Sequence, residues 1–234
     1  MRALYLKELK SYFSSPIGFV ILSIVGVVSS VFFVVSNLMV QTADMSQFFP
    51  MFLFIMVVVV SLITMRLWSD EKAKKTDQLL LTAPVGLFSI TLGKYLAALT
   101  LYGMGMIFPL IYAFILASFG KLDVMVFIGN IFGLMLVGAA LVALGMFISN
   151  LTESQIIAAV IMLAVVLLLG LVGIISQFTQ NTVMLTVLSW ISFFSRYDDF
   201  SVGLLNYADI IYYLSFAAIF LFMTVRFLER RRWN

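Results

Sequence analysis

Charged side chains gather in one stretch of this sequence, and any chemistry or recognition by the chain is expected to involve that stretch. Residues 66–84 read RLWSDEKAKKTDQLLLTAP, in a protein of which only 11% of the residues are charged. Asp70 precedes Lys74 by four positions, and Glu71 precedes Lys75 by four. An acid four residues before a base stabilises a helix, so the spacing predicts a short charged helix.

The predicted helix covers residues 70–82 and is expected to end before Pro84, whose ring cannot continue a helix. It lies between two long apolar runs. A charged helix in such a place is either a solvated connector or a docking element for another protein. The stretch by itself leaves both interpretations open.

Side chains suited to catalysis are scarce in the rest of the chain. Cysteine and histidine are absent, which excludes disulfides, thiol nucleophiles and histidine acid–base chemistry and removes the usual ligands of zinc. The expected membrane spans carry no ionisable residue near their middle, so transport driven by an ion gradient is disfavoured. The run from Gly86 to Tyr95 resembles a phosphate loop, but its glycine spacing is wrong and Tyr95 replaces the residue that would hold Mg²⁺. We expect no enzyme activity, and no metal or cofactor bound by this chain.

Three weaker signals each keep more than one interpretation. The 14 methionines suit either a soft-metal path or the filling of irregular helix contacts. The pair Asp198 and Asp199 suits a hard cation, the cap of a short helix, or an ion pair with Arg196. The GxxxG at residues 129–133 suits either a dimer seam or close packing inside one subunit.

The composition assigns the chain to a lipid bilayer. Hydrophobic residues make up 63% and the mean hydropathy is +1.15, whereas soluble proteins are roughly 45–50% apolar. We predict an all-α membrane protein that forms a single transmembrane domain over residues 1–234. Its six expected spans cover residues 17–40, 50–65, 92–118, 124–149, 155–176 and 209–225. Pro109 predicts a kink in the third span.

The basic residues predict the orientation in the membrane. With six spans, the two ends of the sequence and the connection between spans two and three lie on the same side. These segments carry twelve of the 14 lysines and arginines, and only Lys121 and Arg196 fall on the other side. Basic residues favour the cytoplasmic side. We therefore expect a multi-pass protein of the plasma or inner membrane with both termini in the cytoplasm.

Two further segments are expected at the membrane surfaces. Residues 2–15 form an amphipathic pattern, with Lys7 and Lys10 on one side and Leu9 and Phe13 on the other, which predicts an interfacial helix. Residues 177–207 are too polar to span and rich in aromatic residues, which predicts one or two short helices dipping into the external interface.

Several motifs resemble the membrane subunits of type-2 ABC transporters. The family pattern E…GT…LL…P…GK is similar to the series Asp70-Glu71-Lys72, Thr76-Asp77-Gln78-Leu79-Leu80, Thr82-Ala83-Pro84 and Gly93-Lys94-Tyr95. Lys75 departs from it, because glycine is common at that position. Near the start stand Lys7-Glu8-Leu9 and the run FSSPIG, and with the chain length these look most like the gliding-motility-type (GldF-like) permeases.

The resemblance implies a role for each segment. The helix over residues 70–82 would be a coupling helix that docks a separate ABC-type ATPase, and the helix over residues 2–15 would be the elbow helix. The external segment would close the path outward as re-entrant helices. The residues implied in docking are Asp70, Glu71, Lys74, Lys75, Thr76, Asp77, Leu79 and Leu80. Those implied in the interfacial helix are Lys7, Leu9, Lys10 and Phe13, and those in the external gate are Trp190, Phe193, Phe194, Arg196 and Tyr197.

The resemblance also implies the partners. A second copy or a paralogue would complete the path in the bilayer, ATP and Mg²⁺ would bind the ATPase, and nucleic acid has no part. The expected function is that of a permease subunit of an ATP-driven exporter. The alternative is a non-transporting membrane anchor or assembly factor of a motility or secretion complex. An intramembrane enzyme is the least favoured class, because catalytic side chains are lacking.

Overall fold

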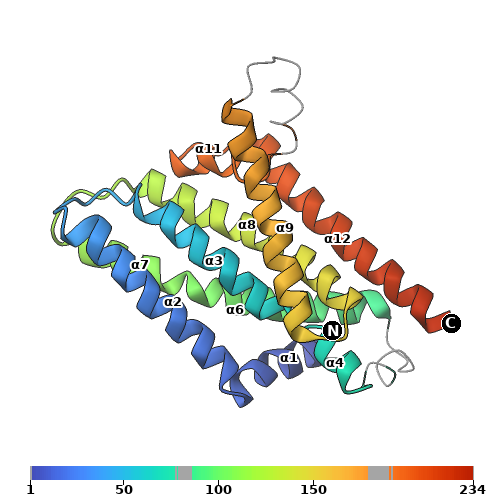
Figure 1. The fold of residues 1–234 in the computed structure, drawn as a ribbon. Helices are drawn as coiled ribbons and strands as arrows, with labels where there is room; N and C mark the ends of the chain where they lie inside the picture. Colours follow the sequence, from blue (N-terminus) through green and yellow to red (C-terminus); the bar gives the residue numbers. More distant parts are fainter. Residues whose placement is uncertain (1, 77, 79–85, 179–189, 191, 234) are drawn as a thin grey trace.

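Long helices running side by side dominate the structure (Figure 1). This computed structural model describes residues 2–76, 78, 86–178, 190 and 192–233. The described residues form helices and no strand. Six helical segments are long and apolar enough to cross a membrane. The prediction of an all-α chain with six candidate spans is therefore confirmed, and the six segments indicate a multi-pass membrane protein.

The spans lie close to their predicted positions. In chain order they are α2 (Ile17–Phe33) with its π-helical end η1 (Val34–Leu38), α3 (Phe48–Thr64), α6 (Leu87–Gly105) with α7 (Ile107–Ala117), α8 (Val124–Leu151), α9 (Gln155–Phe178) and α12 (Tyr207–Trp233). The third begins five residues before the predicted start, and the sixth continues past the predicted end into the basic tail. The sixth span is longer because a helix need not stop where the apolar run stops.

The third span is broken near Pro109. Helix α6 ends at Gly105 and α7 begins at Ile107, with Met106 between them in a turn. Proline has no N–H to donate to the carbonyl four residues earlier, which here belongs to Gly105. The predicted kink is thus present, on the N-terminal side of the proline.

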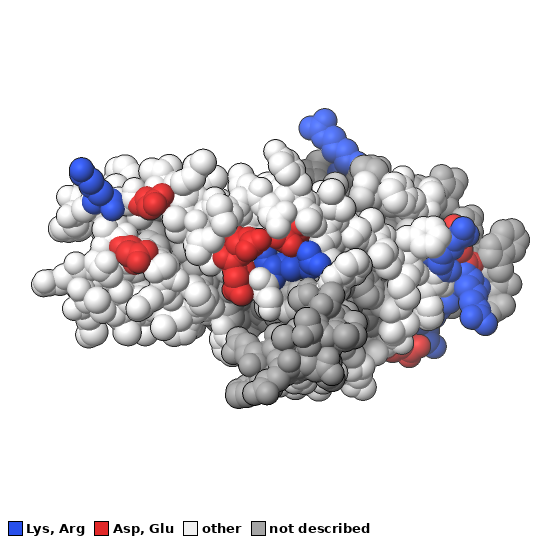
Figure 2. Space-filling model, turned by 90° about the horizontal axis from the view of Figure 1, so that it is seen from above, with Lys and Arg blue, Asp and Glu red and all other residues white. Residues whose placement is uncertain are grey.

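Helix α8 forms the centre of the bundle. In its most apolar window 72% of the residues are buried, against 17% for α9 and 22% for α12. It packs against α3, α6, α9 and α12. The outer faces of α2, α9 and α12 expose large apolar side chains, as a lipid-facing surface requires. Figure 2 shows one face of the molecule as mostly uncharged, with basic and acidic side chains in small separate groups.

The GxxxG of α8 serves packing within this chain. A Cβ on Gly129 would come 2.8 Å from the Phe200 carbonyl oxygen, and one on Gly133 would come 2.7 Å from Phe200 Cβ. Phe200 belongs to the short helix α11 (Tyr197–Ser201). Of the two interpretations of this motif, packing inside one subunit is the one that the structure shows.

Candidate functional site

The short helices lie at opposite ends of the bundle. Figure 1 shows α1 (Arg2–Ser14), α4 (Ser69–Ala73) and the C-terminal end of α12 toward one end, and α11 toward the other. The first end therefore collects the segments that carry most of the basic residues. It also holds the predicted docking residues that the structure describes.

Helix α4 is shorter than the predicted helix over residues 70–82. It ends at Ala73, and Lys75 has a positive φ of 55°. Lys75 N donates to the Lys72 carbonyl at 3.0 Å, and Thr76 N donates to the Glu71 carbonyl at 2.9 Å. These two bonds form a Schellman motif, which satisfies the last carbonyls of a helix and usually has glycine at the left-handed position. Asp77, Leu79 and Leu80 lie outside the described residues.

One of the two predicted ion pairs along this helix is present. Lys74 Nζ lies 3.0 Å from Asp70 Oδ2. Glu71 does not pair with Lys75, because the chain leaves the helix at that point. It pairs with Lys94 instead, at 2.8 Å. The sequence pattern gave no sign of this contact between α4 and the third span.

A buried lysine joins three parts of the chain. Lys94, on α6, is 1% exposed. Its Nζ lies 2.8 Å from Glu71 Oε1 and 3.2 Å from Glu8 Oε1, and it donates to the Leu67 carbonyl at 2.9 Å. The same ammonium lies 5.1 Å from the centre of the Trp68 ring. One positive charge is thus shared by two carboxylates, one from α1 and one from α4.

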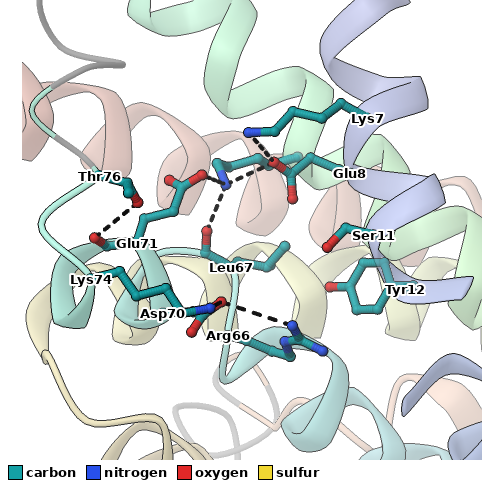
Figure 3. A pocket seen from close by; sticks show the side chains of 11 residues that line it. Lys7, Glu8, Ser11, Tyr12, Arg66, Leu67, Asp70, Glu71, Lys74 and Thr76 are labelled. Carbon is teal, nitrogen blue, oxygen red and sulfur yellow. Dashed lines mark hydrogen bonds and ion pairs between the residues drawn. The ribbon is translucent and has the colours of Figure 1, made fainter. Parts of the chain in front are cut away.

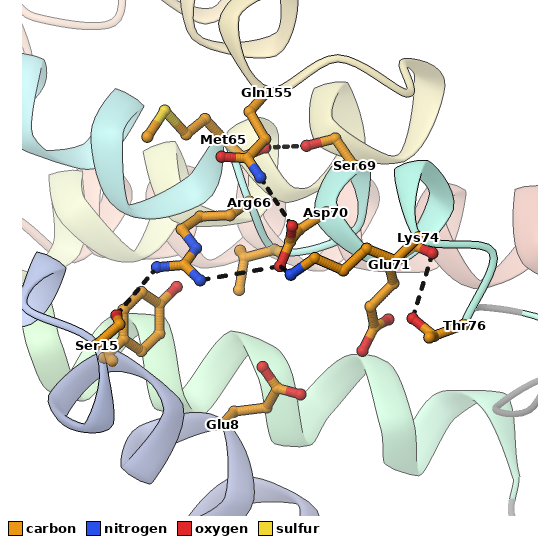
Figure 4. Close-up of polar contacts among 12 residues, drawn as sticks. Glu8, Ser15, Met65, Arg66, Ser69, Asp70, Glu71, Lys74, Thr76 and Gln155 are labelled. Carbon is orange, nitrogen blue, oxygen red and sulfur yellow. Dashed lines mark hydrogen bonds and ion pairs between the residues drawn. The ribbon is translucent and has the colours of Figure 1, made fainter.

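Asp70 is the centre of a second polar group (Figure 4). Besides Lys74, it accepts a hydrogen bond from Gln155 Nε2 at 2.9 Å and lies 3.8 Å from the Arg66 guanidinium. Arg66 also donates to Ser15 Oγ at 3.4 Å. Asp70 thereby connects α4 with the start of α9, and Arg66 connects it with the end of α1.

The end of α8 caps the start of α4. Ser149 Oγ accepts from Trp68 N at 3.1 Å and from Ser69 N at 3.2 Å. The first N–H groups of a helix have no partner within it, and α4 has no capping side chain of its own. Lys72, which is buried, donates from Nζ to the Asn150 carbonyl. Helix α4 is therefore fastened to α8 at both its first turn and its middle.

A cleft of about 410 Å³ separates α1 from α4. Figure 3 shows Lys7, Glu8, Ser11 and Tyr12 on one wall, and on the other the six labelled residues Arg66, Leu67, Asp70, Glu71, Lys74 and Thr76. Its lining residues are Lys7, Glu8, Ser11, Tyr12, Arg66, Leu67, Asp70, Glu71, Lys74, Thr76 and Lys94. The cleft is therefore polar and carries charges of both signs.

Helix α1 packs on α6. Lys7 and Lys10 are exposed as predicted, and Leu9 and Phe13 are partly buried. Leu6 is exposed although it is apolar, whereas the charged Glu8 faces the protein. The difference arises because the hydrophobic pattern of one helix does not reveal that a buried lysine of α6, Lys94, pairs with the Glu8 carboxylate. Lysine and glutamate are almost never buried unless they are paired.

The described residues of the predicted external segment, 190 and 192–207, lie at the opposite end of the bundle, whereas residues 179–189 and 191 of that prediction lie outside the described residues. Phe193 is buried and Phe194 partly buried, while Trp190 is 73% exposed. Tyr197 donates from its hydroxyl to Asn130 Oδ1 of α8 at 2.6 Å. Arg196 pairs with Asp209 of α12 at 2.7 Å. This segment is therefore anchored to α8 and α12.

The pair Asp198 and Asp199 lies in the first turn of α11. The expected ion pair with Arg196 is not found among the described residues, because that guanidinium binds Asp209. Asp199 accepts from Asn206 Nδ2 at 3.3 Å. Burial and the neighbouring charge of Asp199 raise the pKa of the Asp198 carboxyl.

No family model and no curated protein matches this chain. Functional inference therefore starts from the geometry of the site itself.

Proposed function

We propose that this chain is the permease subunit of an ATP-driven exporter of the type-2 ABC class. In this proposal residues 66–76 dock a separate ATPase subunit in the cytoplasm. A second copy or a paralogue completes the path across the plasma or inner membrane. ATP and Mg²⁺ bind the ATPase, and the hydrolysis of ATP drives transport.

The observation that carries the proposal is how firmly a very short helix at the end of the bundle is tied to the spans. Helix α4 has only five residues, too few to be a stable helix alone. It is nevertheless held to α1 and α6 through Lys94, to α8 through Ser149 and to α9 through Gln155. Removing one partner of a buried ion pair costs about 3–5 kcal/mol. In this proposal a displacement of α4 therefore moves the spans with it, because breaking the contacts would cost more.

A plain connector between two spans does not need such contacts. A loop that only joins two helices is solvated and tolerates change. Here the connection buries Trp68, Ser69 and Lys72 against neighbouring helices. This favours the docking interpretation over the solvated connector. An element that transmits movement must have discrete packed arrangements, and buried polar contacts provide them.

The backbone of the turn after α4 bears on Lys75, the residue at which the sequence departs from the family pattern. Lys75 occupies a position where glycine is common in the family. Its φ of 55° is a conformation that glycine adopts freely and other residues adopt at a cost. A backbone that suits glycine at this position supports the proposal, although the residue here is lysine.

The remaining roles follow from the same proposal. The positive-inside rule places α1, α4 and the end of α12 in the cytoplasm. Helix α1 is the elbow helix at the membrane interface. The segment around α11 faces outward, and its contacts with α8 and α12 close the path on that side.

In this proposal the ATPase is contacted directly by the exposed residues of the docking segment, residues 66–76. The Glu71 side chain is only 14% exposed, so it is better placed to hold the segment than to meet a partner. The Lys74 side chain is 65% exposed, and Lys75 is exposed too. These two lysines are therefore the first candidates for contact.

The test is co-expression of the chain with each P-loop ATPase encoded beside its gene. We expect the ATPase to co-purify and its hydrolysis to rise when the permease is present. The double variant Lys74→Glu with Lys75→Glu is expected to lose both effects while inserting normally. Lys121→Glu, a charge reversal at the other end of the bundle, is the matched control and should keep both. Co-purification with no effect of the permease on hydrolysis or transport would instead favour the anchor.

A further inference from the structure

The cleft between α1 and α4 holds a carboxylate that lacks its full set of partners. Glu71 Oε1 is bound by Lys94, but Glu71 Oε2 is buried and has no hydrogen-bond partner among the described residues. Glu8 also uses its Oε1 for the pair with Lys94. Buried polar atoms are normally satisfied, so this oxygen marks a place where a donor is missing.

The other cations around the cleft are occupied elsewhere. Lys74 and Arg66 both lie beside Asp70, at 3.0 and 3.8 Å. Lys7 lies 3.8 Å from Glu8, and its side chain is 62% exposed, so water screens its charge. At the floor of the cleft, Lys94 is the buried cation that the Glu8 and Glu71 carboxylates share. The lining carries four basic and three acidic side chains, so it is the unpartnered Oε2 of Glu71, and not the net charge, that marks a place for a donor.

We propose that a basic side chain of the docking partner, an arginine foremost, enters this cleft and binds Glu71 opposite Lys94. This inference rests on the proposed function, because it supposes a partner at this end of the bundle. Arginine fits best because its planar guanidinium offers donors in a fork that matches carboxylates. With the Glu8 and Glu71 carboxylates directed to the same lysine, a fork between them meets both (Figure 3).

Entry of the side chain requires little rearrangement. Glu71 lines the cleft, although its Oε2 lies below the accessible surface. Rotation about χ3 of a glutamate has a broad energy profile. The carboxylate can therefore turn its free oxygen toward the cleft while Lys94 remains held by Glu8 and by the Leu67 carbonyl. An arginine bound there would contact both walls of the cleft, α1 through Glu8 and α4 through Glu71.

The test uses agmatine, which carries a guanidinium on an alkyl stem like that of arginine. The full chain is reconstituted in lipid nanodiscs with Trp190→Phe and Trp233→Phe, so that Trp68, whose ring packs on Lys94, is the sole fluorophore. We expect a saturable change in Trp68 emission with agmatine. Neutral butylurea, and sodium chloride at equal ionic strength, should give none.

Two variants report on the cleft. Glu71→Gln keeps the shape and removes the charge, and is expected to weaken agmatine binding about tenfold or more. Ser11→Phe fills the mouth of the cleft from α1 without adding a second tryptophan, leaves the ion pairs intact, and should block binding. Glu229→Gln changes a glutamate on the exposed end of α12 and should leave binding unchanged. Circular dichroism checks that each variant is folded.

The inference is overturned if butylurea or sodium chloride gives the same signal. It is also overturned if folded Glu71→Gln and Ser11→Phe bind agmatine like the parent, or if agmatine gives no signal at all. The experiment needs no ATPase, so its result is separate from that of the co-purification test. If agmatine binds but no ATPase co-purifies in the other test, the proposed function is refuted and the cleft remains a site for a cationic group.

Discussion

Replacing Lys94 by methionine is the perturbation with the largest expected effect. Methionine has nearly the same length as the lysine stem and no charge, so it fills the space and removes only the ammonium. Glu8 and Glu71 then lose their shared cation, and the Leu67 carbonyl loses its donor. Breaking a buried pair by removing one partner costs about 3–5 kcal/mol. We expect a loss of stability of about that size.

The magnitude follows from the geometry of the two carboxylates. Both side chains are 14% exposed, so neither can recover full hydration in the folded chain. The matched control is Lys74→Met, which removes an ammonium at a similar distance from Asp70. Its side chain is 65% exposed, and exposed ion pairs contribute about 0–1 kcal/mol. The two lysines should therefore differ by several kcal/mol.

The assay is reversible unfolding in mixed micelles, followed by tryptophan fluorescence. A triple variant, Lys94→Met with Glu8→Gln and Glu71→Gln, separates charge from packing. If the uncompensated carboxylates cause the loss, the triple variant should be more stable than Lys94→Met alone, because no buried charge remains unpaired. Equal stability of the two variants, or a loss in Lys94→Met no larger than in Lys74→Met, would refute the reasoning.

Three further substitutions test other parts of the structure. Gly133→Ile should cost about 1–3 kcal/mol in the same unfolding assay, because its side chain would overlap Phe200, whereas Gly86→Ala, with open space around it, should be nearly neutral. Lys75→Gly should be stabilising by up to about 1 kcal/mol, since it relieves a left-handed conformation of a residue with a side chain; a destabilised variant would show that the lysine itself holds the turn. The raised pKa of Asp198 means that the folded chain favours its neutral form, so this group adds stability at pH values below its unfolded pKa, and the gain is lost as pH rises through the folded pKa. Asp198→Asn should therefore flatten that part of a stability-against-pH curve, and an unchanged curve would count against it.

The spans could be predicted because their signal is local. A run of apolar residues of sufficient length is enough to identify a candidate span, whatever it packs against. The kink at Pro109 is local in the same sense, since it depends on one missing N–H. The end of the sixth span was less predictable, because helix propensity continues where hydrophobicity stops.

The candidate site could be predicted only in outline. The charged stretch and the pair of Asp70 with Lys74 follow from spacing along one helix. The pairs of Lys94 with Glu8 and Glu71 depend on the folding together of three segments, and Glu8 is 86 residues from Lys94. The end of α4 depends on Lys75 adopting a positive φ, which lysine rarely does. A glycine at position 75 would have predicted that the helix ends there.

The capping of α4 by Ser149 has a consequence for how the chain is made. The hydroxyl that holds the first turn of α4 lies 80 residues further along the chain than Ser69. At a synthesis rate of about 5–20 residues per second, Ser149 follows Ser69 out of the ribosome by roughly 4–16 s. During that interval five residues cannot sustain a helix by themselves. The segment around α4 therefore reaches its folded form only once the fourth span has been translated.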